Sequence, residues 1–200
     1  STSKDVEWFF GDYLNTSKKI DYTIKEVTSI NDSLKITIKN KRNITAPVAL
    51  YGIKNKKIHF KTWVNGIDST KTITIAKGNF DKVALNYEQI YPEYNSLDNS
   101  KNIYKKFLNK PLQFRLIKDL SDPYYNQLFY QPVVDYNYYD GLRIGTKLHN
   151  KPIIKRNFSF KLIPTYATKS NALNGSAAMT YTQFLETSKL RSITYGVSAS

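Results

Sequence analysis

The sequence predicts a mainly β protein with a short N-terminal helix, an immunoglobulin-like β-sandwich and then an antiparallel meander that forms an incomplete outer-membrane-type barrel. Three observations predict this fold. Apolar residues follow a helical period before residue 18 and alternate with polar ones after residue 20. Short turns rich in Asn, Asp, Ser and Gly separate the alternating segments. Tyrosine provides 16 of the 200 residues, and it suits positions where one end of the ring is dry and the other is wet.

Composition limits the possible sites and partners. The chain has no Cys, so it forms neither a disulfide nor a thiolate metal site. Its net charge of +14 invites a nucleic-acid function, but the Lys residues are spread along strands and no RNA- or DNA-binding motif is present. We therefore expect no nucleic-acid partner. The sequence contains no run of about 18 apolar residues, so no transmembrane helix is predicted. The start at STSKD, without Met, indicates processing or truncation.

Residues 1–18 are predicted to form the last helix of an upstream helical domain. Thr2 is a candidate N-cap, and the acidic residues Asp5 and Glu7 follow in the first turn, where the helix dipole favours them. The apolar residues recur at helical spacing and are Val6, Phe9, Phe10, Tyr13 and Leu14. Nothing in the following segment is obviously shaped to receive these rings, so we assign the helix to a larger domain.

Residues 19–87 are predicted to form the β-sandwich, because short alternating segments follow one another at close intervals. The side chains predicted to point inward are Ile36, Ile38, Ile58, Phe60, Ile73 and Ile75. Trp63 is predicted to pack in the core, with a binding surface as the alternative. His59 has no second His, Cys or paired carboxylate nearby in the sequence, so we assign it a structural role rather than a metal-binding one.

Residues 88–138 are predicted to be an aromatic-rich connector. A short helix is expected near Ser100, and a strand is expected within residues 111–120. Seven aromatic side chains then fall close together, namely Tyr124, Tyr125, Phe129, Tyr130, Tyr136, Tyr138 and Tyr139. Two uses are open for this cluster: it stacks bases or sugars, or it forms a girdle where hydrocarbon meets water.

Residues 139–200 are predicted to form the first four strands of a β-barrel. The side chains predicted to face lipid are Leu142, Ile144, Leu148, Phe158, Phe160, Leu162, Ile193, Tyr195 and Val197, whereas Arg143, Lys147, Lys161 and Thr194 are predicted to face the lumen. A water-soluble sheet also alternates, but the clean small and polar face and the preceding aromatic cluster favour the barrel. Because closure takes about eight strands, we expect the barrel to be truncated here.

A resemblance to a known family covers nearly the whole chain. The end of the helical domain and the β-sandwich of Bacteroidetes-type aminopeptidase N-like zinc metallopeptidases are similar to DVEWFFGDYLNTSKKIDYTIKEV and LKITIKNKRNITAPVALYGI. The passage into their C-terminal outer-membrane-type barrel is similar to PLQFRLIKDLSDPYYNQLFYQPVVDYNYYDGLRIG. The resemblance implies a location at the outer membrane or the periplasmic face of a Gram-negative bacterium, with membrane lipid and the upstream peptidase domain as partners.

No catalytic, cofactor-binding or metal-binding residue is assigned in this chain. The family's activity rests on an H-E-x-x-H helix and a downstream Glu that bind zinc and activate water, and neither His59 nor His149 lies in such a frame. The resemblance therefore implies a non-catalytic C-terminal part of a membrane-associated peptidase, whose upstream domain binds zinc and the peptide substrate. Whether that parent is an active enzyme stays open. The alternatives are a binding or assembly protein without peptidase activity and a carbohydrate-binding β-module.

Overall fold

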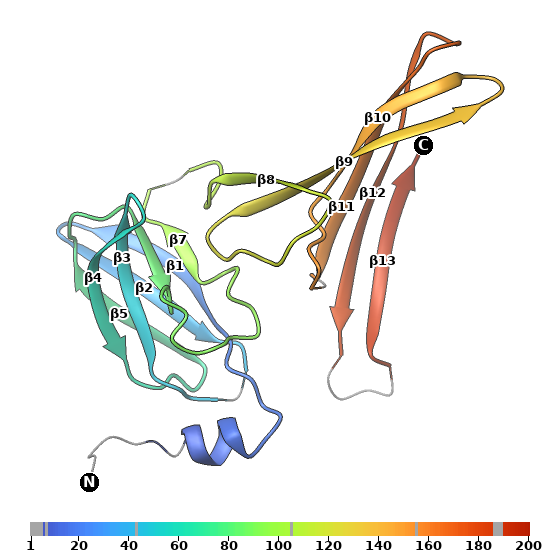
Figure 1. Cartoon of the computed structure of the whole chain (residues 1–200). Coiled ribbons are helices and arrows are strands. Elements are labelled where there is room, and N and C mark those ends of the chain that lie inside the picture. The colour runs from blue at the N-terminus through green and yellow to red at the C-terminus, as the bar shows by residue number, and fades with distance from the viewer. Residues whose placement is uncertain (1–5, 7, 43, 105, 155, 186–189) are drawn as a thin grey trace. The chain divides into compact units, whose positions relative to one another are not determined.

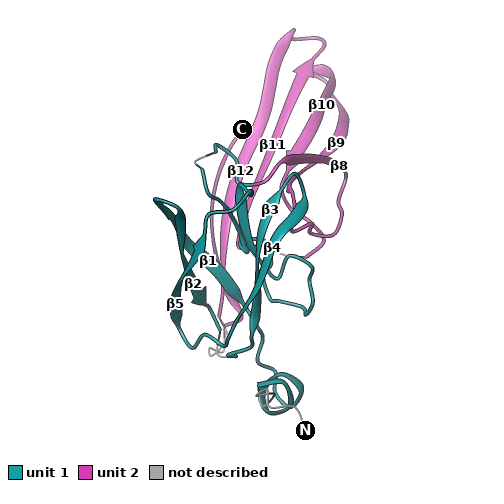
Figure 2. Ribbon diagram, turned by 90° about the vertical axis from the view of Figure 1, so that its left-hand side faces the viewer, with its two compact units in different colours: residues 1–109 teal, residues 110–200 magenta. Residues whose placement is uncertain are grey.

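The chain divides into two compact units, residues 1–109 and residues 110–200, shown in teal and magenta in Figure 2. The computed structural model describes residues 6, 8–42, 44–104, 106–154, 156–185 and 190–200. Unit 1 contains one short helix and two sheets, and unit 2 contains a single sheet (Figure 1). The fold is therefore mainly β, as the alternation predicted.

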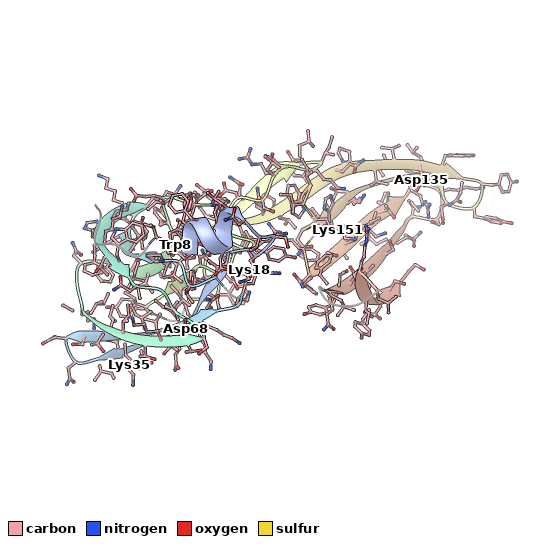
Figure 3. All side chains as sticks on the ribbon, turned by 90° about the horizontal axis from the view of Figure 1, so that it is seen from below. Trp8, Lys18, Lys35, Asp68, Asp135 and Lys151 are labelled. Atoms are coloured by element: carbon pink, nitrogen blue, oxygen red, sulfur yellow. The ribbon has the colours of Figure 1, made fainter. Side chains whose placement is uncertain are left out.

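The N-terminal helix η1, Trp8–Leu14, is a single short π-helix. Trp8 and Tyr13 pack against the sandwich core, and the Trp8 ring lies 6.4 Å from the ring of Tyr91 (Figure 3). The sandwich thus supplies the receiving surface that the sequence did not reveal. Phe10 and Leu14 of the predicted stripe stay exposed. The predicted capping residues Thr2, Asp5 and Glu7 lie outside the described residues.

Unit 1 is a sandwich of two antiparallel sheets. One sheet has the order β1 (Tyr22–Ile30), β2 (Ser33–Asn40) and β5 (Thr70–Ala76), and the other has the order β4 (Lys57–Val64), β3 (Val48–Lys54), β6 (Lys82–Leu85) and β7 (Ser100–Asn102). The sequential pairs β1–β2 and β3–β4 form hairpins. The chain then passes from β4 to β5 in the first sheet, and from β5 back to β6 in the second sheet. This three-plus-four arrangement is immunoglobulin-like.

The core of unit 1 lies between the two sheets. Ile36 and Ile38 from one sheet and Leu50 and Val83 from the other are fully buried. Tyr22 is buried with them, and its single hydroxyl hydrogen is shared between the carbonyl oxygens of Ala46, at 2.7 Å, and Ile44, at 3.1 Å. The other inward residues predicted correctly are Phe60, Ile73 and Ile75, which pack against this core. The buried tyrosine costs little because its polar end is satisfied.

The prediction that Trp63 packs in the core is wrong, since its side chain is 51% exposed. Strand alternation explains the position, because Val64 pairs with Val48 on the core side and Trp63 pairs with Ala49 on the outer side. Ile58 is also exposed, contrary to prediction. The pairing of β3 with β4 shifts by one residue at His59, and this bulge turns Ile58 to the outer face.

The helix predicted near Ser100 is also wrong. Residues 100–102 form the short strand β7, whose three residues pair with 82–84 of β6. The sequence of β7 does not predict a strand, because the segment is short and polar. Its pairing is also non-local, since its partner lies almost twenty residues earlier in the chain.

The sheet of unit 2 runs in chain order: β8 (Leu112–Leu116), β9 (Asn126–Asn137), β10 (Gly141–His149), β11 (Phe158–Ala167), β12 (Ala172–Phe184) and β13 (Ser192–Ala199). Only the β8–β9 pair is parallel, and β9 to β13 form an open antiparallel meander (Figure 1). The strand expected within residues 111–120 is present as β8, and residues 139–200 contain the four strands β10–β13. They are not the first strands of the meander, because β9, which lies in the predicted connector, pairs with β10.

The exposed position of Trp63 predicts a small effect of its removal. In residues 1–109, which contain their own core, Trp63→Ala should lower the free energy of unfolding by less than about 1 kcal/mol. Ile36→Ala, at a fully buried position of the facing sheet, should lower it by about 2–5 kcal/mol. Urea unfolding followed by circular dichroism measures both values. A loss near 3 kcal/mol for Trp63→Ala would contradict the outward orientation.

Candidate functional site

One face of the unit 2 sheet is apolar and exposed; we call it the apolar face. Its large side chains are between 37% and 84% exposed, and they are Tyr130, Val134, Tyr136, Leu142, Ile144, Phe158, Leu162, Tyr166, Leu173, Met179, Tyr181, Ile193, Tyr195 and Val197. Every large residue predicted to face lipid lies on this face, including the half-buried Leu148 and Phe160. An exposed apolar surface of this extent marks an interaction with a protein or a membrane.

Cross-strand pairing makes the apolar face continuous. Val134, Ile144, Tyr166 and Leu173 form one row across four strands. Two further rows run from β11 to β13, namely Phe160, Met179 and Val197, and Phe158, Tyr181 and Tyr195. At the outward positions of β9–β13, all of which the structure describes, no Asp, Glu, Lys or Arg occurs.

The opposite face, which we call the inner face, carries the polar residues. Gln127, His149, Ser159 and Thr165 are buried there although they are polar. The residues predicted to face a lumen, Arg143, Lys147, Lys161 and Thr194, all lie on this face. Four polar side chains of unit 2 are therefore buried on the inner face, whereas the large side chains of the apolar face are exposed.

Hydrogen bonds satisfy the polar groups of the inner face. Arg143 donates to both carboxylate oxygens of the directly paired Asp135, at 2.6 and 2.8 Å. The Gln127 amide donates to the Leu120 carbonyl oxygen at 3.1 Å and accepts from the Asp122 N–H at 3.0 Å. The partly exposed Arg143–Asp135 pair joins neighbouring strands, and the hydrogen bonds of Gln127 offset the cost of burying its amide.

His149 is a packing residue of the inner face. Its ring stacks on the buried Phe129, with centroids 5.5 Å apart, and its Nδ1 accepts the N–H of Lys151 at 3.2 Å. His59 lies at the bulge of β4 in the other unit. Among the described residues, no group of three or more His, Cys, Asp or Glu side chains is arranged to hold a metal ion.

The aromatic cluster of the sequence is divided among several positions. Tyr130 and Tyr136 lie on the apolar face of β9, whereas Phe129 is buried on the inner face. Tyr138 and Tyr139 occupy the β9–β10 turn at 76% and 83% exposure. These residues do not form one stacking surface. The alternation that makes β9 part of the apolar face was visible in the sequence, but the density of tyrosines there suggested a connector.

A half-buried acid of unit 1 accepts several hydrogen bonds, and sequence patterns gave no sign of it. The Glu93 carboxylate accepts hydrogen bonds from the Asn86 amide at 2.9 Å, the Asn99 amide at 2.8 Å and the Tyr22 N–H at 3.1 Å. Burial raises the pKa of Glu93 to about 7, more than these donors lower it. Its contacts join the loop before β7 to β1, so its role is structural.

No protein-family model, curated protein or solved structure matches this chain. Among the described residues, the only helix is far too short to cross a bilayer.

The raised pKa of Glu93 predicts that the stability of unit 1 depends on pH. Because the folded-state pKa is raised above the ordinary 4.5, the stabilisation is present in full below pH 4.5 and is lost as the pH rises through 7. The free energy of unfolding of residues 1–109 should therefore be about 2 kcal/mol larger at pH 5 than at pH 8. Glu93→Gln should remove the contribution of Glu93 and leave that of Asp21, whose pKa burial raises to about 6. Urea titrations at both pH values test it, and an equal slope in the variant would contradict it.

Proposed function

We infer that unit 2 contributes β-strands to an outer-membrane-type barrel and places its apolar face against lipid. One observation supports this function above the others: five adjacent strands expose a continuous apolar face without a charged residue, while the charged residues of these strands all lie on the inner face. Barrel strands in membranes have this apolar-out, polar-in alternation. Lipid is the occupant that matches a face with apolar side chains and no charge, because hydrocarbon makes no hydrogen bonds.

Strand length and aromatic placement support the same occupant. The strands β9–β13 have 12, 9, 10, 13 and 8 residues, and a tilted strand needs about 9–11 residues to cross the hydrocarbon core. Tyr136, Tyr138 and Tyr139 gather at the β9–β10 hairpin, and Tyr166 ends β11 beside it. Tyrosine at one end of a strand array fits the boundary between lipid and water.

The proposed parent is a membrane-associated zinc metallopeptidase of the aminopeptidase N-like type. The sequence resemblance supports this part of the proposal. In it, the upstream domain binds zinc and hydrolyses peptides at the outer membrane or periplasmic face, unit 1 is the non-catalytic sandwich that follows, and unit 2 is the anchor. In this proposal the present chain anchors the peptidase at the membrane and takes no part in catalysis. Nucleic acid is not among its proposed partners.

Two adjacent residues of β13 provide a matched test of the lipid contact. Val197 is on the apolar face and Ser198 is on the inner face, and both are exposed. A charge on the lipid side of a membrane strand costs about 2–4 kcal/mol near the bilayer midplane. Val197→Lys should therefore weaken association of the chain with phosphatidylethanolamine–phosphatidylglycerol vesicles at least tenfold, whereas Ser198→Lys should change it less than twofold. Vesicle flotation measures the bound fraction.

The opposite result has a clear meaning. Equal flotation of both variants, together with a chain that is monomeric in buffer without detergent, would contradict the membrane function. The alternation would then belong to a second water-soluble module, and a binding or assembly protein would be the better description. Trp63, exposed on the outer face of unit 1, would be the first residue to test for carbohydrate binding in that case.

The proposal also predicts that this chain has no zinc chemistry of its own. His59 and His149 lie in different units, and neither has a carboxylate partner in the described hydrogen bonds. Zinc retained after dialysis should be well below one equivalent per chain, and peptide hydrolysis should be at background level. Elemental analysis and a chromogenic aminopeptidase substrate measure the two. Stoichiometric zinc that disappears in His59→Ala or His149→Ala would overturn this prediction.

A further inference from the structure

A cavity of about 430 Å³ lies on the inner face of unit 2. Its lining comes from the segment after β8, from the β10–β11 connection and from the inner positions of β11, β12 and β13. The lining residues are Lys118, Lys151, Pro152, Ile153, Ile154, Arg156, Ser159, Thr180, Thr182, Phe184, Ser192 and Thr194. Its size is in the range of about 300–1,000 Å³ that small-molecule sites occupy.

The charged lining residues are all cations. Lys118, Lys151 and Arg156 line the cavity, and none of its lining residues is acidic (Lys151 is labelled in Figure 3). Two guanidinium nitrogens of Arg156, Nε and Nη2, are buried and have no hydrogen-bond partner among the described residues. Burial lowers the pKa of Arg156, although arginine stays protonated in proteins. A buried guanidinium without a partner is costly, and an anion at this position would remove that cost.

Hydroxyl groups complete the lining as hydrogen-bond donors. Ser159 and Thr180 hydroxyls lie 2.6 Å apart, and Thr182 and Thr194 hydroxyls lie 2.9 Å apart. Each pair contains two hydroxyl hydrogens and uses one between its own oxygens. One hydrogen in each pair therefore remains for a ligand. The cavity offers guanidinium, ammonium and hydroxyl donors, and none of the described residues that line it carries a carboxylate.

The walls around Arg156 are held in place by backbone contacts. The Ile153 N–H donates to the Asp119 carbonyl oxygen at 3.0 Å. Asn157 and Thr182 are joined twice, through the Thr182 N–H at 2.6 Å and the Asn157 amide at 3.1 Å. These contacts hold the chain on both sides of Arg156 in the sequence, at Ile153 and at Asn157.

We propose that this cavity is a binding site for a phosphate-bearing small molecule or headgroup. The two free nitrogens of Arg156 match two oxygens of one phosphate group, a pairing that the planar guanidinium makes in a bidentate manner. Three cations suit a phosphate, which carries up to two negative charges, better than a single carboxylate. The cavity has room for the organic part of the ligand beside Ile153, Ile154 and Phe184. The site goes beyond the membrane function and does not rest on it.

The test uses the full chain in dodecyl maltoside micelles and phosphate-free buffer. Isothermal titration calorimetry with inorganic phosphate, glycerol 3-phosphate and glycerol should show binding of the two phosphate compounds and none of glycerol. Arg156→Gln should weaken glycerol 3-phosphate binding at least tenfold. Lys35→Gln makes the same change of charge on an exposed strand position of unit 1 and should change the affinity less than twofold.

A second variant and a second readout keep the result decisive. Removing an unpaired buried charge should not weaken folding, and circular dichroism checks this for Arg156→Gln. If that variant does not fold, Lys151→Gln, at an exposed lining residue, should weaken binding at least threefold. Glycerol 3-phosphate should raise the melting temperature of the wild-type chain and not that of Arg156→Gln.

The source of the phosphate is a separate arm of the same experiment. Micelles that contain phosphatidylglycerol should compete with glycerol 3-phosphate if the ligand is a lipid headgroup, and they should not compete if it is a soluble phosphate ester; both outcomes support the site. A wild-type chain that binds neither phosphate compound, or lining variants with unchanged affinity, would overturn it. Because the measurement is made in detergent, its failure is distinct from a failure of the vesicle test.

Discussion

Alternation of side chains along a strand is the constraint on which both units depend, because it gives every strand two faces whose chemistry the sequence sets independently. In unit 1 the apolar faces of two sheets meet, so Ile36 and Leu50 are fully buried between them. Unit 2 has one sheet, and its apolar residues lie on the face without a protein partner in the described part of the chain. The same strand geometry therefore produces a water-excluding core in one unit and an exposed apolar face in the other.

On the inner face of unit 2, the backbones of neighbouring strands approach closely at a glycine. Gly145 pairs with Val133 on one side and Thr165 on the other. A Cβ added at Gly145 would lie 2.1 Å from the Pro164 carbonyl oxygen, so this position accepts no larger residue without displacing the backbone. Close approach at this point brings β10 and β11 together, while Arg143 and Asp135 neutralise one another on the neighbouring strands. Small residues and paired charges take the place of an apolar core.

Much of this arrangement followed from sequence periodicity, and the failures have specific causes. The inward positions Ile36 and Ile38 and the strands β10–β13 followed directly from a period of two. The same rule places Trp63 on the outer face, because it is an odd number of residues away from the inward-facing Val64 and Phe60. Ile58 could not be placed by this rule, because the bulge at His59 depends on pairing with β3. Pairing of β7 with β6 and the assembly of the Arg156 cavity are likewise non-local, and no short sequence window contains them.

The distribution of charged residues between the two faces of unit 2 distinguishes the proposed functions better than hydrophobicity does. The strands β9–β13 contain four charged residues, so about two outward positions would carry a charge if the two faces were equivalent. None does, and the charged residues within these strands, Asp135, Arg143, Lys147 and Lys161, all lie on the inner face. A protein-binding surface has no need to exclude charge so completely, because its polar rim is solvated. Hydrocarbon does impose that exclusion, since a charge near the bilayer midplane loses its water without gaining a partner. The absence of charge on the apolar face is therefore the property on which the proposed lipid contact rests.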